Sequence, residues 1–221
     1  MKSSILVFFL LLTSFALTAS AQKVISDGKL VYNISIESTN GEKQPAGSLT
    51  GATLSVFLTK DKSRTEMVST PGTETLIYDN KSRKGIILKE YSGQKLMITA
   101  TGDNWAQKNL VNNTLNFKTD NTPITIAGYN CRKATAVSSD GKIYTVYFDP
   151  TTEIANKTYN NAFPQLRGLP VQYELQSGNL VFKYTLTDHN SEAVPPTKFD
   201  VPKAGFRIMT YEENQQLKKG E

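Results

Sequence analysis

Cysteine, histidine and tryptophan each occur once in the 221 residues, as Cys131, His189 and Trp105. One cysteine permits no intramolecular disulfide, which excludes a disulfide-stapled miniature domain. A zinc site typically needs several histidine or cysteine ligands, and the chain supplies one of each. The sequence also lacks the Gly-x-Ser-x-Gly nucleophile elbow and the acidic loop of an EF-hand. We therefore expect no bound metal, no cofactor and no enzymatic activity.

The few residues that could act as nucleophiles or bases stand in unfavourable surroundings. Ser-x-x-Lys, an acyl-transfer pattern, begins at Ser26, Ser92 and Ser139, but each copy lies in a glycine-containing turn before a strand. In such a turn the lysine points away from the serine. A Ser-His-Asp triad is recognised by geometry, so residue order alone does not exclude one. We expect His189 to be an exposed loop histidine and Cys131 to be a small buried packing residue.

Long apolar runs are scarce, because only the N-terminus carries one. Lys2 precedes the apolar run Ile5–Leu12, and Ala19-Ser20-Ala21 forms a small-x-small cleavage site. These features predict a secretory signal peptide over residues 1–21, and the run is too short to serve as a comfortable membrane anchor. No cysteine stands at the cleavage point, so we expect a protein exported to the periplasm without a lipoprotein anchor. The mature chain should be soluble, with no integral membrane segment, and should form a single β-rich domain over residues 22–221.

Charge is present in modest amounts and is spread along the chain. The formal net charge is +5, and it becomes +4 in the mature chain because the signal peptide carries one base and no acid. Tight basic clusters such as Lys81–Lys84 and Arg132-Lys133 are short, and no nucleic-acid-binding motif accompanies them. We therefore expect no nucleic-acid partner.

The remaining pattern is typical of a mainly β protein. Turn signals recur roughly every 8–12 residues, which is the spacing of antiparallel sheets, sandwiches and barrels. We predict about ten strands and two or three short helices, arranged as a curved antiparallel sheet or an open half-barrel. Asp103 is the expected N-cap of the first helix, and Thr210 with Glu213 matches a capping box before the last. The expected strands are 30–37, 54–59, 64–69, 75–78, 85–88, 94–99, 171–175, 180–186 and 206–210, and the expected helices are 104–111, 152–159 and 211–218.

The clearest hairpin lies at Ile124–Phe148. Its turn contains Asp140-Gly141, a dipeptide that accepts the positive φ angles of a tight hairpin. Its second arm carries apolar groups on both faces, which predicts burial on both faces or one face lining a cavity. We expect this hairpin to form the middle of the sheet, with Gly128 as a bend in its first arm.

Aromatic residues lie mostly inside the expected strands, so core packing is the default explanation for them. If the sheet is open and strongly curved, however, short helices cover little of its concave face and a ligand cavity is plausible there. The candidate ligand-binding residues are Met97, Trp105, Tyr129, Tyr144, Val146, Phe148, Phe163 and Tyr173.

Four segments carry a resemblance to a known family: Leu49–Arg64, Ile126–Ala134, Gly168–Tyr173 and Phe199–Tyr211. With its Gly-Tyr-x-Cys and Gly-Leu-Pro motifs, the chain resembles an uncharacterised family of exported bacterial proteins, common in Bacteroidetes, that carries a domain of unknown function. The Gly-Leu-Pro element is also similar to a secreted family with a Gly-Leu-Pro-Gly-Leu-Ile motif, although Val171 and Gln172 replace the later residues.

These families look like distant relatives of the LolA/LolB lipoprotein carriers. The resemblance implies an open half-barrel whose helices cover an apolar cavity that holds acyl chains. It also implies a periplasmic location and a lipid or lipoprotein as partner, and it carries over no catalytic residue.

Two functions therefore stay open at the level of sequence. The first is a non-enzymatic periplasmic protein that binds an apolar ligand in the concavity of a curved sheet. The alternative is a structural or interaction protein of the envelope, which would hold a protein partner through sheet edges or through the loop 149–169.

Overall fold

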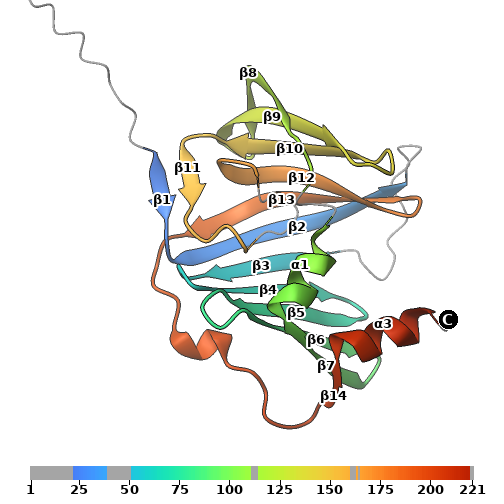
Figure 1. Ribbon diagram of the computed structural model, residues 1–221. Coiled ribbons are helices and arrows are strands. Elements are labelled where there is room, and N and C mark those ends of the chain that lie inside the picture. Colours follow the sequence, from blue (N-terminus) through green and yellow to red (C-terminus); the bar gives the residue numbers. More distant parts are fainter. Residues whose placement is uncertain (1–21, 39–50, 111–113, 160–162, 164, 220–221) are drawn as a thin grey trace, which may run out of the picture.

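A curved, open sheet of twelve strands organises the chain (Figure 1). The computed structural model describes residues 22–38, 51–110, 114–159, 163 and 165–219, so the expected signal peptide lies outside the described residues. The strand order in the sheet is β14-β7-β6-β5-β4-β3-β2-β13-β12-β10-β9-β8. Their bounds are β2 (Gly28–Ser38), β3 (Thr53–Leu58), β4 (Lys62–Ser69), β5 (Gly72–Asp79), β6 (Lys84–Tyr91), β7 (Gln94–Thr101), β8 (Lys118–Ile126), β9 (Tyr129–Val137), β10 (Ile143–Asp149), β12 (Leu169–Ser177), β13 (Leu180–Asn190) and β14 (Arg207–Thr210).

Neighbouring strands in this sheet are antiparallel, apart from one pair at its edge. Strand β14 runs parallel to β7, because the chain crosses the sheet between β13 and β14. A separate parallel pair joins β1 (Lys23–Ile25) to β11 (Thr152–Ile154). The predicted mainly β fold with a curved, open antiparallel sheet is confirmed, whereas the two parallel pairs were not predicted.

The predicted hairpin Ile124–Phe148 is formed in its second half, and it lies at one end of the sheet. Strands β9 and β10 pair as expected around the Asp140-Gly141 turn. The first arm is divided, however, by a tight turn at Ala127 and Gly128, with φ of +48° and +82°, so β8 and β9 form a hairpin of their own. The expectation of a central position is wrong, because β13 pairs with β2 and places β8–β10 at one end of the sheet.

Two α-helices lie in the described part of the chain, as expected. Helix α1 (Gly102–Lys108) begins after Thr101, whose hydroxyl accepts from the Asn104 amide at 3.2 Å, so the prediction of Asp103 as N-cap is wrong. Helix α3 (Tyr211–Lys219) has the predicted capping box, in which the Thr210 amide donates to Glu213 Oε2 at 2.7 Å. A short 3-10 turn, η1 (Pro196–Phe199), lies between β13 and β14.

The third expected helix, over residues 152–159, is replaced by strand β11 and turns. Ile154 and its parallel partner Ile25 are both buried, so this segment gains more by pairing with β1 than by forming an exposed helical turn. Neither described α-helix is long and apolar enough to cross a membrane.

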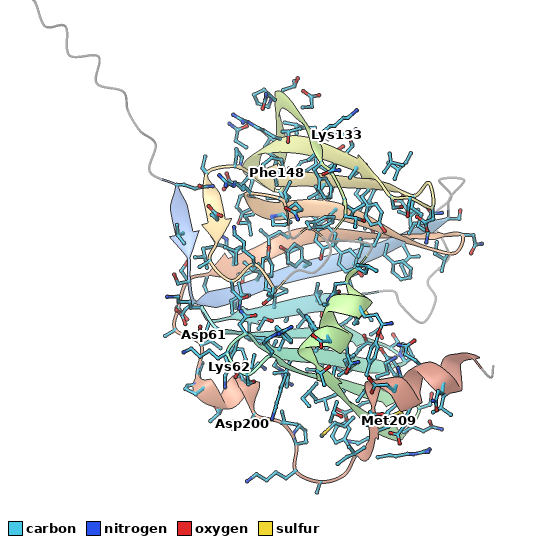
Figure 2. The ribbon with its side chains drawn as sticks, viewed as in Figure 1. Asp61, Lys62, Lys133, Phe148, Asp200 and Met209 are labelled. Atoms are coloured by element: carbon cyan, nitrogen blue, oxygen red, sulfur yellow. The ribbon has the colours of Figure 1, made fainter. Side chains whose placement is uncertain are left out.

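Buried side chains form two clusters on one face of the sheet. Residues paired across a ladder share a face, and the pairs Ile87–Leu76, Leu76–Thr65, Thr65–Val56 and Val56–Leu30 run from β6 to β2. The same face therefore carries both clusters, with Phe148 and Met209 at opposite ends of the sheet (Figure 2). The filled end contains Ile25, Leu30, Tyr32, Val56, Leu58, Cys131, Ala134, Val146, Phe148, Ile154, Tyr159, Phe163, Leu166, Leu169, Val171, Tyr173 and Leu186; the helix-covered end contains Tyr78, Ile87, Ile98, Ala100, Trp105, Met209 and Tyr211.

Candidate functional site

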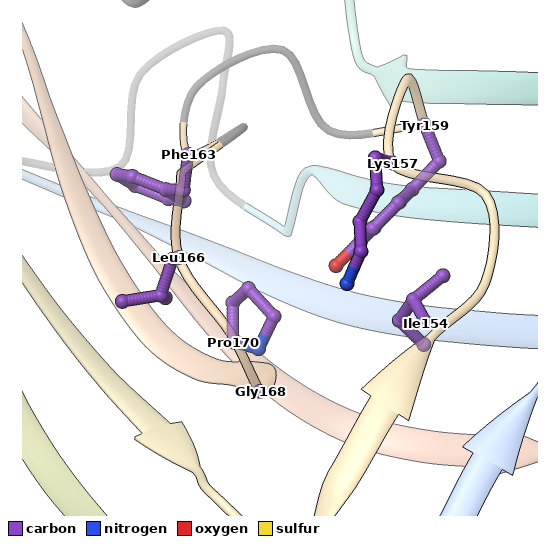
Figure 3. A pocket seen from close by; sticks show the side chains of 7 residues that line it. All are labelled: Ile154, Lys157, Tyr159, Phe163, Leu166, Gly168 and Pro170. Atoms are coloured by element: carbon purple, nitrogen blue, oxygen red, sulfur yellow. The ribbon is translucent and has the colours of Figure 1, made fainter.

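The filled end is closed by the chain itself. Tyr159, Phe163 and Leu166, from the segment between β11 and β12, fold onto the sheet and are buried (Figure 3). The void among these side chains measures only about 10 Å³, roughly the space that one water needs. Between these described side chains there is therefore no room for a ligand. The side chains that surround the void are those of Ile154, Lys157, Tyr159, Phe163, Leu166 and Pro170, with Gly168.

Aromatic rings account for the tight packing there. Tyr173 stacks on Tyr184 with ring centroids 4.6 Å apart and meets Tyr32 and Phe163 edge-on at 5.5 and 5.0 Å. The Tyr32 hydroxyl donates to the Pro170 carbonyl at 2.9 Å, which satisfies its one polar group. Burial raises the pKa of Tyr32 and Tyr173 well above the ordinary value, so both rings stay neutral.

Asn156 fixes the covering segment to the sheet. It is almost completely buried, and its Nδ2 donates to the carbonyls of Thr59 and Lys62 at 2.9 and 3.0 Å. Its Oδ1 accepts from Asn80 Nδ2 at 3.2 Å and from the Thr158 hydroxyl at 2.8 Å. A buried amide with its donors and acceptor all used is a strong positional constraint.

The helix-covered end is open by comparison. A groove of about 670 Å³ lies over β5, β6 and β7, between α1 and α3. Ile87 and Ile98 contribute apolar side chains from the sheet, and Tyr211 contributes a ring from α3. The volume falls within the roughly 300–1,000 Å³ of small-molecule sites. The complete lining is Glu74, Ile87, Lys89, Ile98, Gln107, Lys108, Tyr211, Asn214 and Gln215, and these residues define the groove below.

Helical spacing explains the walls of the groove. Tyr211, Asn214 and Gln215 stand at positions i, i+3 and i+4 of α3, so they share one face of that helix. The capping bonds of Thr210 fix where this face begins. On the sheet side, Lys89 lies opposite Glu74 in the β5–β6 ladder, and their charged groups are 3.5 Å apart.

Glu74 also affects the pKa of a tyrosine on another strand of the sheet. Burial raises the pKa of Tyr184 on β13, and the nearby Glu74 carboxylate on β5 raises it further. Three strands, β4, β3 and β2, separate these two strands in the sheet order.

Trp105 is the buried residue of α1, and the helix lies beside the groove. Its ring stacks on Tyr78 with centroids 4.6 Å apart, and a Cβ at Gly85 would come within 2.7 Å of the indole. The buried indole Nε1 finds no hydrogen-bond partner within the residues that the structure describes. As the one tryptophan of the chain, it is a natural fluorescent reporter of events in the neighbouring groove.

The eight predicted ligand-binding residues are not gathered at one opening. Val146, Phe148, Phe163 and Tyr173 are buried in the filled end, and Tyr129 and Tyr144 pack against it. Trp105 belongs to the helix-covered end, and Met97 lies on the opposite face of the sheet from its neighbour Ile98. No ligand tests these assignments, which stay predictions. The groove residues were missed because they come from five separate elements and share no local motif.

The residues considered for catalysis have clear structural positions. His189 lies in strand β13 and is half-buried, so the expectation of an exposed loop is wrong; its Nδ1 is 2.6 Å from the Tyr129 hydroxyl. Cys131 is fully buried, as predicted, and desolvation raises the pKa of its thiol to about 11. Among the described residues, no three His, Cys, Asp or Glu side chains form a cluster that could hold a metal ion.

A second hollow, of about 300 Å³, lies on the opposite face between β2, β3 and the segment 190–198. Phe57 lines it, and the Lys198 ammonium stands 4.1 Å above the centre of this ring. The same ammonium is 3.3 Å from Glu66, a carboxylate that also pairs with Arg64. Ala193, Val194 and Pro195 add apolar groups to its lining, and its volume is less than half that of the groove.

Comparisons with known proteins identify a similar fold and no family. No protein-family model matches the sequence, and no curated protein matches it. Among solved structures, PNGF-II is 14% identical and superposes with a TM-score of 0.51 over 87% of this chain and 33% of that one, so this chain spans about a third of PNGF-II. MucB is 11% identical with a TM-score of 0.39, over 84% of this chain and 60% of that one. The Mycobacterium tuberculosis lipoprotein LppX is 11% identical with a TM-score of 0.38, over 74% of this chain and 88% of that one.

The likeness to PNGF-II concerns the fold alone. The motif-based resemblance to an exported family stays a prediction.

Proposed function

We propose that the protein is a non-enzymatic binding protein of the cell envelope, which holds an apolar or amphipathic ligand on the concave face of its sheet. A lipid, or the acyl chain of a lipoprotein, has the required chemistry. One observation carries the proposal: the groove between α1 and α3 combines apolar groups from the sheet with polar walls and has the volume of a small-molecule site.

The proposed location in the periplasm rests on the signal-peptide pattern of residues 1–21. A binding role, in place of catalysis, is supported by the surroundings of the reactive side chains. The Cys131 thiol is buried and stays protonated at neutral pH, and the groove lining contains no cysteine, histidine or serine.

The test uses Trp105 fluorescence of the full mature chain during titration with a single-chain amphiphile such as dodecyl maltoside, below its critical micelle concentration. We expect a saturable change in the intensity or wavelength of the emission. Gln215→Phe places a ring in the groove and should weaken binding at least about tenfold, an energy comparable to the burial of one apolar side chain.

Gln216→Phe is the matched control, because the neighbouring residue of α3 is exposed and does not line the groove. Equal weakening by both variants, or the absence of any saturable signal, would overturn the proposal. If the probe binds as expected, mass spectrometry of organic extracts from protein purified from its native host would identify the natural ligand.

The alternative function, a protein that holds an envelope partner, finds support at the other end of the sheet. Strand β8 is the last strand of the sheet in the described part of the chain, and the cross-strand neighbours Val137 on β9 and Ile143 on β10 are about two-thirds exposed. The loop 149–169 is less suited to this role, because Ile154, Phe163 and Leu166 among its described residues are buried in the filled end. Photo-cross-linking from position 137 in cells would trap a protein if this function holds, while lipid extraction would recover no ligand.

A further inference from the structure

We propose that the ligand is a single-chain amphiphile with an anionic headgroup, and that Lys89 binds this headgroup at the end of the groove. This inference rests on the proposed function and adds the chemical class of the ligand. The relevant observations are the position of Lys89 on the sheet, the charge of the groove lining and the limited space.

Lys89 stands where a headgroup would lie if the apolar chain covered the groove floor. It follows Ile87 by two residues on β6, so both side chains are on the same face, about 7 Å apart along the strand. Ile98 lies directly opposite Ile87 on β7. An amphiphile can therefore place its chain over the two isoleucines while its headgroup reaches the ammonium of Lys89.

The charges of the lining favour an anion over a cation. Lys89 and Lys108 contribute two positive charges, and Glu74 contributes one negative charge. Glu74 and Lys89 are each about 28–29% exposed, and their charged groups are 3.5 Å apart. A partly exposed pair of this kind is weak, so the ammonium can bind a second anion alongside the carboxylate. A cationic headgroup would meet the like charges of Lys89 and Lys108. Electrostatic complementarity therefore also disfavours a cationic ligand.

The available space favours one chain. The groove holds about 670 Å³, which suits a single small molecule, and the neighbouring filled end leaves only about 10 Å³ between its side chains. The groove therefore gains no further space among these described side chains of the filled end.

The experiment compares three probes with the same twelve-carbon chain: dodecanoate, dodecyl maltoside and dodecyltrimethylammonium. Each is titrated below its critical micelle concentration into the full mature chain, with Trp105 fluorescence as the readout. We expect dodecanoate to bind about tenfold more tightly than the other two, since a charge-assisted hydrogen bond to an ammonium is among the stronger polar contacts. Added salt should reduce this difference.

Lys89→Gln should weaken dodecanoate binding about tenfold and thereby remove the preference for dodecanoate over dodecyl maltoside, whereas Lys89→Arg should retain this preference. Lys95→Gln is the matched control: this residue is also a strand lysine paired with a glutamate, at 2.7 Å, and it does not line the groove. Near-ultraviolet circular dichroism checks that each variant folds.

The outcomes separate the two levels of the proposal. If the three probes bind equally well, or if Lys89→Gln weakens all of them alike, the anionic headgroup is excluded and the binding function stands. If no probe binds to the folded wild-type protein, both the inference and the proposed function fail.

Discussion

The two ends of the concave face are covered in opposite ways. At the filled end, the segment between β11 and β12 buries Tyr159, Phe163 and Leu166 against the sheet and leaves space for about one water. At the helix-covered end, Asn104 Nδ2 of α1 donates to Glu212 Oε1 of α3 at 2.6 Å, and the two helices leave a groove of about 670 Å³ between them. The sheet face is continuous between them, so the covering segments determine where a ligand can bind.

The covers also differ in how they are held. The segment at the filled end is fixed by the buried Asn156 amide and by aromatic contacts with the strands. The helices are short and are fixed largely by their N-terminal caps and by single aromatic residues, Trp105 and Tyr211. We infer that the filled end supplies stability and that the helix-covered end supplies binding.

The largest expected effect comes from removing an aromatic ring at the filled end. Phe148→Ala should lower the free energy of unfolding by about 3–5 kcal/mol, because it removes a buried ring and leaves a cavity. Urea unfolding measures the change, and Ile143→Ala on the exposed part of the same strand should stay within about 0.5 kcal/mol. A loss below about 1 kcal/mol for Phe148→Ala would show that this end is loosely packed and would remove the contrast.

Asn156→Ala should cost about 2–3 kcal/mol, because the variant removes a buried amide that donates to the carbonyls of Thr59 and Lys62 and accepts from Asn80 and Thr158. Asn130→Ala, at an exposed position of β9, serves as the control and should change stability little. If the variant also binds ligand in the groove as the wild type does, this result would support the inference that the filled end supplies stability and the helix-covered end supplies binding.

The thiol of Cys131 tests whether the filled end is closed to solvent. With its pKa raised to about 11 by burial, it should react with a thiol reagent at pH 8 about a hundredfold more slowly than the unfolded chain. The stability that depends on this thiol is complete below the unfolded pKa of about 8.5 and is lost as pH rises through the folded value. Rapid labelling of the native protein would contradict the closed packing.

The smallest effect concerns the turn between β9 and β10, outside both covers. The Ser138 hydroxyl and the Lys142 ammonium hold the pKa of the Asp140 carboxyl at about 2. The stability that it contributes is present above the unfolded pKa of about 3.9 and is lost as pH falls through about 2. Asp140→Asn should remove this acid-dependent part, and a carboxyl titration followed by NMR would expose an ordinary pKa if the turn contacts are absent.

Much of the fold could be predicted because its signals are local. The Asp140-Gly141 turn and the Thr210–Glu213 capping box each lie within four residues, and both were found where the sequence placed them. The Ala127 turn was missed because alanine rarely adopts a positive φ angle, so the dipeptide gives a weak turn signal.

The groove could not be predicted because its residues are distant from one another in the sequence. Glu74, Ile98 and Gln215 acquire a common neighbourhood only after the sheet curves and α3 returns to it across the edge strand β14. The position of the β8–β10 strands was likewise set by the distant pairing of β13 with β2, which leaves no mark in the hairpin itself.

The buried amide of Asn156 has a consequence for producing the protein. Asn156-Lys157-Thr158 is an acceptor sequence for N-linked glycans. A glycosylating host modifies such a site as the chain emerges, before the fold can hide it. A glycan on this nitrogen would occupy the place of the Thr59 and Lys62 carbonyls, so the modified chain could not complete its fold. Bacterial expression avoids this modification, and a glycosylation inhibitor avoids it in a secretory eukaryotic host.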